Sequence, residues 1–172
     1  MTAREWLDAV LPLYKRYYDI ETEDVQAPFA AKAVFKSHNE QYFLVKAAKV
    51  ADIDSNEYVY FIVTDTVDTC KLNDFARSAW DEGMRQVVPE YGHRNSDVTL
   101  YILCESMEED VRRLVKKTCY SKSYKFGLYG WSNFRLVTIE ASSNTATYNR
   151  QGRQLKKLIG SINKQNHIMK KE

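Results

Sequence analysis

The sequence predicts an α+β fold in a single domain, with a mixed sheet built on an antiparallel three-stranded meander. First, 172 residues, 44% of them hydrophobic, are enough to bury one core. Second, the 12 tyrosines and 7 phenylalanines favour half-buried strand positions. Third, segments of helical spacing and of period two alternate in the order α-βββ-α-β-α-β-β-α, which is typical of a sheet covered by helices.

The first half of the chain predicts a helix and then the meander. Thr2 and Glu5 have the spacing of a capping box, so we expect a helix over about 3–19, interrupted at Pro12. An acidic connection, "DIETEDVQAP", follows. From Phe29 the apolar residues alternate in "FAAKAVFK" and "QYFLVKAAKVAD", on either side of a hairpin loop at "SHNE". The third strand, "EYVYFIVT", has little polar interruption and is predicted to be buried on both faces.

The second half predicts helices alternating with strands. A helix starts near Asp68, and "VTLYILC" reads as a buried strand. Ser106 and Glu109 form a second capping-box spacing, which predicts a helix ending at Lys117. The segment "SYKFGLYGWSNFRLVTIE" predicts one or two strands broken at its glycines, and "FRLVTIEASSNTATYN" predicts a hairpin. Asn149 is placed to cap a last helix. We expect the domain to cover residues 1–163 and residues 164–172 to form a flexible basic tail.

Charge is distributed unevenly along the chain. Residues 1–110 carry a balance of −10, and residues 111–172 carry a balance of +12, although the net charge is only +2. Such asymmetry indicates a polyanionic partner for the basic end. Alternatively, the two halves neutralise each other across the surface of one fold.

Several classes of activity lack their motifs. A metal-dependent nuclease of the restriction-endonuclease type is disfavoured because the chain contains no (D/E)-x-K tripeptide. His38, His93 and His167 are too dispersed for a zinc site, so we expect no metal. No glycine-rich nucleotide-binding motif is present, and we expect no cofactor. An enzyme is therefore less expected than a binding module, although side chains distant in sequence can still meet in a fold.

Cysteine usage and hydropathy suggest a compartment. Three widely spaced cysteines without a CxxC pair predict reduced thiols in a cytoplasmic protein. Cys119, which follows two lysines, is the candidate for a reactive thiol. No apolar run approaches the ~18 residues of a membrane helix, and the N-terminus has no apolar signal segment, so we expect no membrane partner.

Basic and aromatic residues are interleaved in the last third of the chain, as in surfaces that neutralise phosphates and stack on bases. Strand alternation would bury Tyr124, Phe126 and Leu128 on one face and leave mainly the other face free. The candidate binding residues are Lys122, Lys125, Tyr129, Trp131, Arg135, Arg150, Arg153, Lys156 and Lys157. The preferred hypothesis is a module that binds nucleic acid or another polyanion. The alternatives are a protein-interaction or homo-oligomerising domain and an enzyme of unrecognised type.

Four stretches also carry a resemblance: "EQYFLVKAAKV", "EYVYFIV", "SYKFGLYGWSNFRLVTIE" and "TYNRQGRQLKKLI", in this order. With them, roughly residues 28–163 resemble a family of small uncharacterised bacterial proteins in which a segment like "CYSKSYKFGLYGWS" precedes a strand and a basic helix. The resemblance implies a stand-alone bacterial cytosolic domain. It implies no activity and no catalytic residues.

Overall fold

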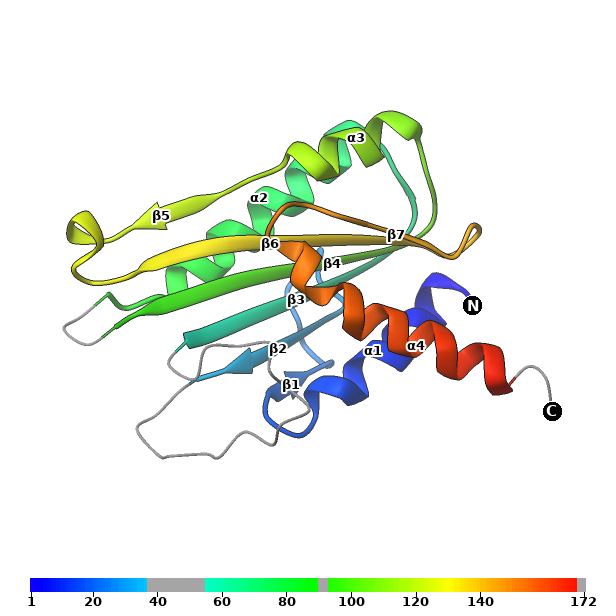
Figure 1. The fold of residues 1–172 in the computed structure, drawn as a ribbon, viewed down its shortest axis with the longest axis horizontal. Helices are drawn as coiled ribbons and strands as arrows, with labels where there is room; N and C mark the ends of the chain where they lie inside the picture. Colours follow the sequence, from blue (N-terminus) through cyan, green and yellow to red (C-terminus); the bar gives the residue numbers. More distant parts are fainter. Residues whose placement is uncertain (37–54, 90–92, 170–172) are drawn as a thin grey trace.

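Helices cover both faces of a seven-stranded sheet in the computed structural model, which describes residues 1–36, 55–89 and 93–169 (Figure 1). The elements are α1 (Ala3–Tyr14), β1 (Asp19–Glu21), β2 (Ala31–Phe35), β3 (Ser55–Val67), α2 (Thr69–Gln86), β4 (Asn95–Met107), α3 (Glu109–Lys117), β5 (Ser121–Ser123), η1 (Lys125–Gly127), β6 (Trp131–Glu140), β7 (Thr145–Tyr148), η2 (Gly152–Leu155) and α4 (Lys156–Met169).

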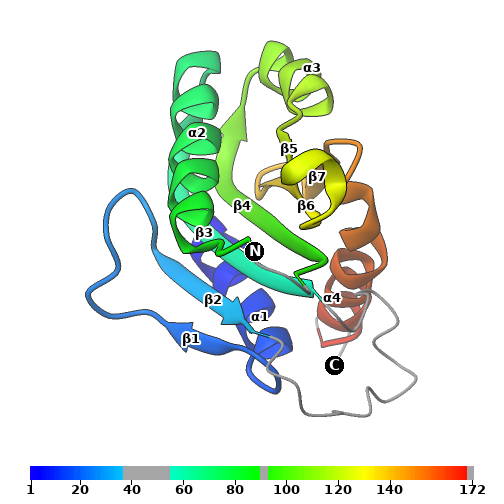
Figure 2. The ribbon, with the colours of Figure 1, turned by 90° about the vertical axis from the view of Figure 1, so that its left-hand side faces the viewer.

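The sheet is mixed, with the order β1-β2-β3-β4-β6-β5. Strands β1, β2 and β3 pair antiparallel, whereas β3, β4 and β6 run parallel. Both β5 and β7 pair antiparallel with the outer edge of β6, β5 near its start and β7 near its end. Helices α2 and α3 lie on one face of the sheet, and α1 and α4 lie on the other (Figures 1 and 2). The predicted α+β fold class is therefore confirmed.

The buried strands β3, β4 and β6 form the centre of the molecule. Because successive side chains point to opposite faces, each strand contributes to two separate cores. Phe61, Tyr101 and Val137 pack toward α1 and α4, whereas Tyr60 and Leu100 pack toward α2 and α3. The prediction that "EYVYFIVT" is buried on both faces is confirmed for Glu57 to Ile62.

Local signals predicted several helix ends correctly. Thr2 and Glu5 form the reciprocal hydrogen bonds of a capping box at the start of α1. The Asp68 carboxylate accepts from the Lys71 N–H at 2.8 Å and caps α2. The second predicted capping box is wrong, because β4 continues to Met107 and the N-cap of α3 falls on Glu108, which makes no side-chain capping bond.

At the edge of the sheet one prediction is wrong and another falls outside the described residues. Residues 19–21, expected in a connection, form strand β1 against β2. The predicted strand at "QYFLVKAAKVAD" and its hairpin loop lie outside the described residues. Helix α4 extends to Met169, and the division into a domain over residues 1–163 and a tail over residues 164–172 stays a prediction.

Candidate nucleic-acid interface

Exposed basic side chains gather along the outer edge of β6 and on the segments beside it. They come from the end of α3, from β5 and η1, and from the chain around η2 and the start of α4. We call this set the basic edge: Lys116, Lys117, Lys122, Lys125, Arg150, Arg153, Lys156 and Lys157. Six of the eight were candidates from the sequence, and the fold adds the two lysines that end α3.

The buried amide of Asn149 brings these segments together. Its Oδ1 accepts from the N–H groups of Leu136 (3.0 Å) and Gly152 (2.6 Å). Its Nδ2 donates to the carbonyls of Phe134 (2.9 Å) and Thr118 (3.1 Å). One side chain thus joins the end of α3, the edge of β6 and the start of η2, and it places Arg150 beside the chain that follows Lys117. The sequence predicted Asn149 as the cap of the last helix. In the structure its amide does accept from the Gly152 N–H, but the N-cap of η2 is Gln151.

The basic edge has no local acidic counterpart. Residues 111–139 contain no Asp or Glu. Arg112 and Arg113, earlier on α3, pair with Glu109, Glu140 and Asp110. In the part of the chain that the structure describes, no ion pair involves any member of the basic edge.

The loop between β5 and β6 projects from one end of the sheet (Figure 1). We call residues 124–131 the aromatic tip. Phe126 is 106% exposed, Leu128 80% and Trp131 48%. Lys125 and Phe126 have φ of 44° and 55°, so a 3₁₀ turn replaces the strand alternation that predicted Phe126 and Leu128 in the core. Tyr124 alone of that predicted apolar face is buried.

Hydrogen bonds fix the base of the aromatic tip. The ring of His93 bonds through Nδ1 to the Tyr129 carbonyl (2.7 Å) and through Nε2 to the Ser96 hydroxyl (2.8 Å). The Tyr124 hydroxyl lies 2.9 Å from that of Ser132. A Cβ at Gly130 would come within 2.1 Å of the Arg94 carbonyl, so only glycine permits this close contact. The tip is thus anchored to the starts of β4 and β6.

Two lysines of the basic edge lie over tyrosine rings. The Lys122 ammonium is 5.5 Å from the ring centroid of Tyr124, and the Lys125 ammonium is 4.6 Å from that of Tyr129. Such cation–π contacts hold the charges at the aromatic tip without neutralising them.

Arg135 lies elsewhere, in a buried cluster beneath α1. Its guanidinium donates to Glu57 Oε1 at 3.1 Å and to Asp97 Oδ2, and it is only 7% exposed. Thr99 and Tyr18 donate to the Glu57 carboxylate at 2.9 and 2.7 Å. The structure thus separates Arg135 from the other sequence candidates, which are exposed or, for Tyr129, half-buried.

Burial governs the ionisation of this cluster. Burial raises the pKa of Asp97, and Glu57 adds to the rise, although Arg135 opposes it. Burial lowers the pKa of the Arg135 guanidinium, but the charges of Glu57 and Asp97 outweigh burial and raise it. Arg135 stays charged and stabilises two buried carboxylates, a structural role.

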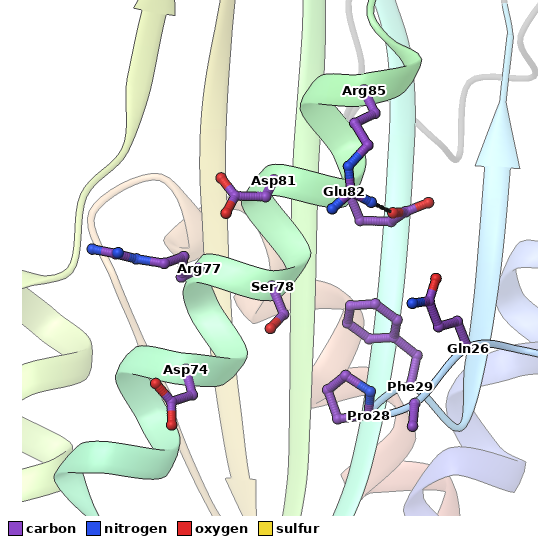
Figure 3. Close-up of a pocket in the computed structure, with 10 residues that line it drawn as sticks. Gln26, Pro28, Phe29, Asp74, Arg77, Ser78, Asp81, Glu82 and Arg85 are labelled. Carbon is purple, nitrogen blue, oxygen red and sulfur yellow. Dashed lines mark hydrogen bonds and ion pairs between the residues drawn. The ribbon is translucent and has the colours of Figure 1, made fainter.

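Two features come nearest to a catalytic arrangement among the described residues. Ser96 hydrogen-bonds to His93, but Ser96 is fully buried and has no access to a substrate. A shallow pocket of about 320 Å³ lies between α2 and residues 26–29 (Figure 3). In it Glu82 and Arg85 pair with each other, and Arg77 points away from Phe29. Neither feature presents a nucleophile hydrogen-bonded to a base at an open site within the described residues.

Metal-ligating residues do not cluster within the described ranges, where no group of three or more His, Cys, Asp or Glu side chains has the arrangement to hold an ion. In the same residues, no helix has both the length and the apolarity needed to cross a bilayer.

Fold and surface together define an α+β domain whose mixed sheet carries a basic outer edge and a projecting aromatic loop. The chain belongs to a family described as a domain of unknown function (DUF8052), whose model matches residues 2–161. The resemblance to an uncharacterised family is thereby confirmed. Neither the curated proteins nor the solved structures contain a match.

The sequence pattern placed Phe126 in the core because strand alternation was extended from Tyr124 through Leu128, although a break was expected at the glycines. The glycines of "KFGLYG" were the available signal, since two glycines three residues apart favour a turn over an extended strand. Lys116 and Lys117 were interpreted only as positive charges that stabilise the C-terminus of a helix. Their position beside Arg150 depends on the long-range bond between Asn149 and Thr118, which sequence spacing does not reveal.

Proposed function

We propose that this protein is a binding module for nucleic acid or another polyanion, which it contacts through the basic edge. One observation carries the proposal: the eight exposed lysine and arginine side chains of the basic edge lie along one side of the sheet, and none of them forms an ion pair in the described part of the chain. Lysine and arginine that neutralise phosphates release counterions, and this release drives binding. A basic side chain that is already paired with a carboxylate, as Arg113 is with Asp110, contributes less to such binding.

One group of acids lies across the sheet from the basic edge, which favours the same interpretation. Strand β1 and the chain after it carry Asp19, Glu21, Glu23 and Asp24. Four strand spacings separate β1 from β6, or ~19 Å at ~4.8 Å for each spacing. At physiological salt, charges this far apart are screened from each other. The acidic part of the chain therefore leaves the basic edge free for a partner.

The test is a fluorescence-anisotropy titration of a labelled oligonucleotide at several salt concentrations. We expect binding at low salt that weakens steeply as salt rises. The double variant Arg150→Gln/Arg153→Gln should bind less tightly and lower the slope of log K against log salt by ~1.4, at ~0.7 for each lost contact with a single strand.

The matched control is Arg4→Gln/Lys15→Gln, which makes the same change in net charge on α1. Both side chains are exposed and lie outside the basic edge. This variant should keep the slope of the natural protein. Equal effects of the two double variants, or no binding at low salt, would contradict the proposal.

Self-association is a second candidate, favoured by the acidic β1 edge lying opposite the basic edge. The acidic side of one copy would meet the basic side of another, and such a head-to-tail contact is steered by charge. Light scattering should then show a mass that falls from low to high salt. A monomer at both salt concentrations would remove this candidate.

The setting that we propose is the bacterial cytoplasm. Three free cysteines, Cys70, Cys104 and Cys119, support it, since reduced thiols are usual there.

A further inference from the structure

The aromatic tip is not explained by charge neutralisation. A polyanion-binding surface needs cations, and the basic edge supplies them without Phe126, Leu128 or Trp131. Large apolar side chains that are exposed together are unusual on a protein without a partner for them. Here they stand next to Lys122 and Lys125, so the partner of the tip carries negative charge as well as apolar surface.

The conformation of Phe126 costs stability that the fold does not regain through packing. An aromatic residue at a φ of 55° is a genuine outlier, because its Cβ crowds the following carbonyl. Its side chain is nevertheless fully exposed and buries no surface in return. Residues kept in such conformations cluster at ligand-binding sites. The hydrogen bonds of His93 and the close packing of Gly130 hold the tip in this presentation.

The layout of the charges distinguishes a nucleic acid from a membrane. A flat bilayer that received Phe126 and Leu128 would meet only the lysines at the tip. Arg150 and Gly152 lie beside Leu136, five residues along β6 from Trp131, or ~17 Å at ~3.3 Å for each residue. That distance is about twice the screening length at physiological salt. A linear chain of phosphates, in contrast, can follow the edge and end at the tip.

We propose that the aromatic tip stacks on unpaired bases of a single-stranded nucleic acid whose phosphates lie along the basic edge. Phe126 supplies the principal stacking face, and Trp131 supplies a second one at the start of β6. In a duplex the bases already stack on one another and leave no face for Phe126, so the preferred ligand is single-stranded. This inference rests on the proposed function and adds the class of ligand to it.

The experiment compares three labelled ligands of equal length at low salt: a single strand of mixed sequence, an abasic phosphodiester strand and a duplex. The variants are Phe126→Ala and its matched control Leu128→Ala. Both side chains are exposed and apolar, but only Phe126 has a π-face, and neither truncation removes packing from the core. Phe126→Trp tests rescue, because an indole also stacks.

We expect Phe126→Ala to weaken binding of the single strand roughly 5- to 100-fold, the loss of one base–aromatic stack. Binding of the abasic strand should stay the same. Leu128→Ala should change the affinity for either strand by no more than about twofold. Phe126→Trp should restore the affinity for the single strand.

Three results would overturn the inference while leaving the proposed function intact: equal loss with Phe126→Ala and Leu128→Ala, equal loss on the abasic strand, or duplex bound as tightly as the single strand. A separate experiment uses vesicles of phosphatidylcholine mixed with phosphatidylserine. Sedimentation of the protein with these vesicles, abolished by both alanine variants, would assign the tip to a membrane surface instead. If none of the three nucleic-acid ligands binds at low salt, the proposed function itself fails.

Discussion

Arg135 joins two carboxylates that belong to different strands, Glu57 on β3 and Asp97 on β4. All three side chains are less than 10% exposed. A buried ion pair adds little stability compared with apolar packing, but removing one partner leaves an uncompensated charge in the interior. The arginine is thus required by the carboxylates around it.

Replacing Arg135 with alanine should lower the free energy of unfolding at neutral pH by about 3–5 kcal/mol, because Glu57 and Asp97 would remain buried without a cation. The pKa of Asp97 is raised in the folded protein, so Asp97 stabilises the fold at low pH, and this contribution is lost as pH rises through that pKa. The deficit should therefore shrink as pH falls and Asp97 becomes neutral. Urea denaturation at several pH values measures this.

The control for this prediction is Arg113→Ala, which breaks the exposed pair with Asp110 and should change stability by no more than about 0.5 kcal/mol. If Arg135→Ala is as stable as the control but binds oligonucleotide weakly, Arg135 acts in binding rather than in the fold.

Glu140 is a third buried carboxylate, at the opposite end of the strands. Burial raises its pKa, but hydrogen bonds from Ser143, from the Met107 N–H and from Arg112 outweigh burial, and the pKa is lowered. A lowered folded pKa gives stability that is present above the unfolded value of about 4.5 and is lost as pH falls through the folded pKa.

Glu140→Gln should therefore cost about 1.5–3 kcal/mol at neutral pH, since bonds to a charged acceptor are replaced by bonds to a neutral amide. The difference from the natural protein should be smaller at acidic than at neutral pH, because Glu140 itself becomes protonated as pH falls through its lowered folded pKa. Chemical denaturation at the two pH values checks this. Glu109→Gln, at an exposed partner of the same Arg112, should have little effect at either pH. A loss of stability in Glu140→Gln that does not depend on pH would contradict the lowered pKa of Glu140.

Sequence patterns predicted the elements whose cause is local. The capping box of α1, the Asp68 cap of α2 and the hairpin turn between β6 and β7 each depend on residues a few positions apart. The failures have two causes, one tertiary and one local. The strand β1 exists because β2 offers a pairing edge, and the exposure of Phe126 depends on the turn at its glycines rather than on apolar alternation.

The candidate site divides in the same way. Lys122, Lys125, Arg150 and Trp131 are exposed, as simple polarity and end-of-strand arguments suggest. Arg135 has the same local pattern but faces the side of the sheet that α1 covers, and only the tertiary arrangement reveals the two acids beside it. Periodicity predicts which face a residue occupies, but it does not predict what covers that face.

The contact between η2 and β6 gives a prediction with a built-in comparison. A Cβ on Gly152 would lie 2.4 Å from the Leu136 carbonyl, whereas one on Gly160 in α4 would meet nothing within 4 Å. Gly152→Ala should destabilise the fold by about 1–3 kcal/mol and weaken oligonucleotide binding, because η2 must move away from the edge. Gly160→Ala should raise stability by about 0.5–1 kcal/mol through helix propensity. Thermal and urea unfolding measure both stabilities. Equal changes in stability for the two variants would contradict the close packing of η2.

At the scale of the whole molecule, the described acids of β1 and the chain after it lie across the sheet from the basic edge. Their separation of ~19 Å exceeds the screening length of ~8 Å at physiological salt but is shorter than the ~30 Å reached at 0.01 M. The acidic side therefore acts on a bound polyanion only in dilute salt.

Reversing two charges on that side, in Asp19→Lys/Glu23→Lys, should leave oligonucleotide affinity within about twofold at physiological salt. At 0.01 M salt the same variant should bind more tightly than the natural protein, because repulsion from the acids is then felt across the sheet. Anisotropy titrations at both salt concentrations measure this. Strong tightening at physiological salt would mean that the ligand reaches β1 itself.

The Asn149 side chain also affects the behaviour of the protein at high concentration. Strand β6 lies at the side of the sheet where a free edge would invite a strand from another molecule. There β5 and β7 pair with its ends, and the Asn149 amide, with the Tyr120 carbonyl bonded to the Phe134 N–H, occupies the stretch between them. The described backbone of this edge is therefore saturated. Substitution of Asn149 would reopen a strand of strongly apolar sequence to intermolecular pairing, and the expected result is aggregation.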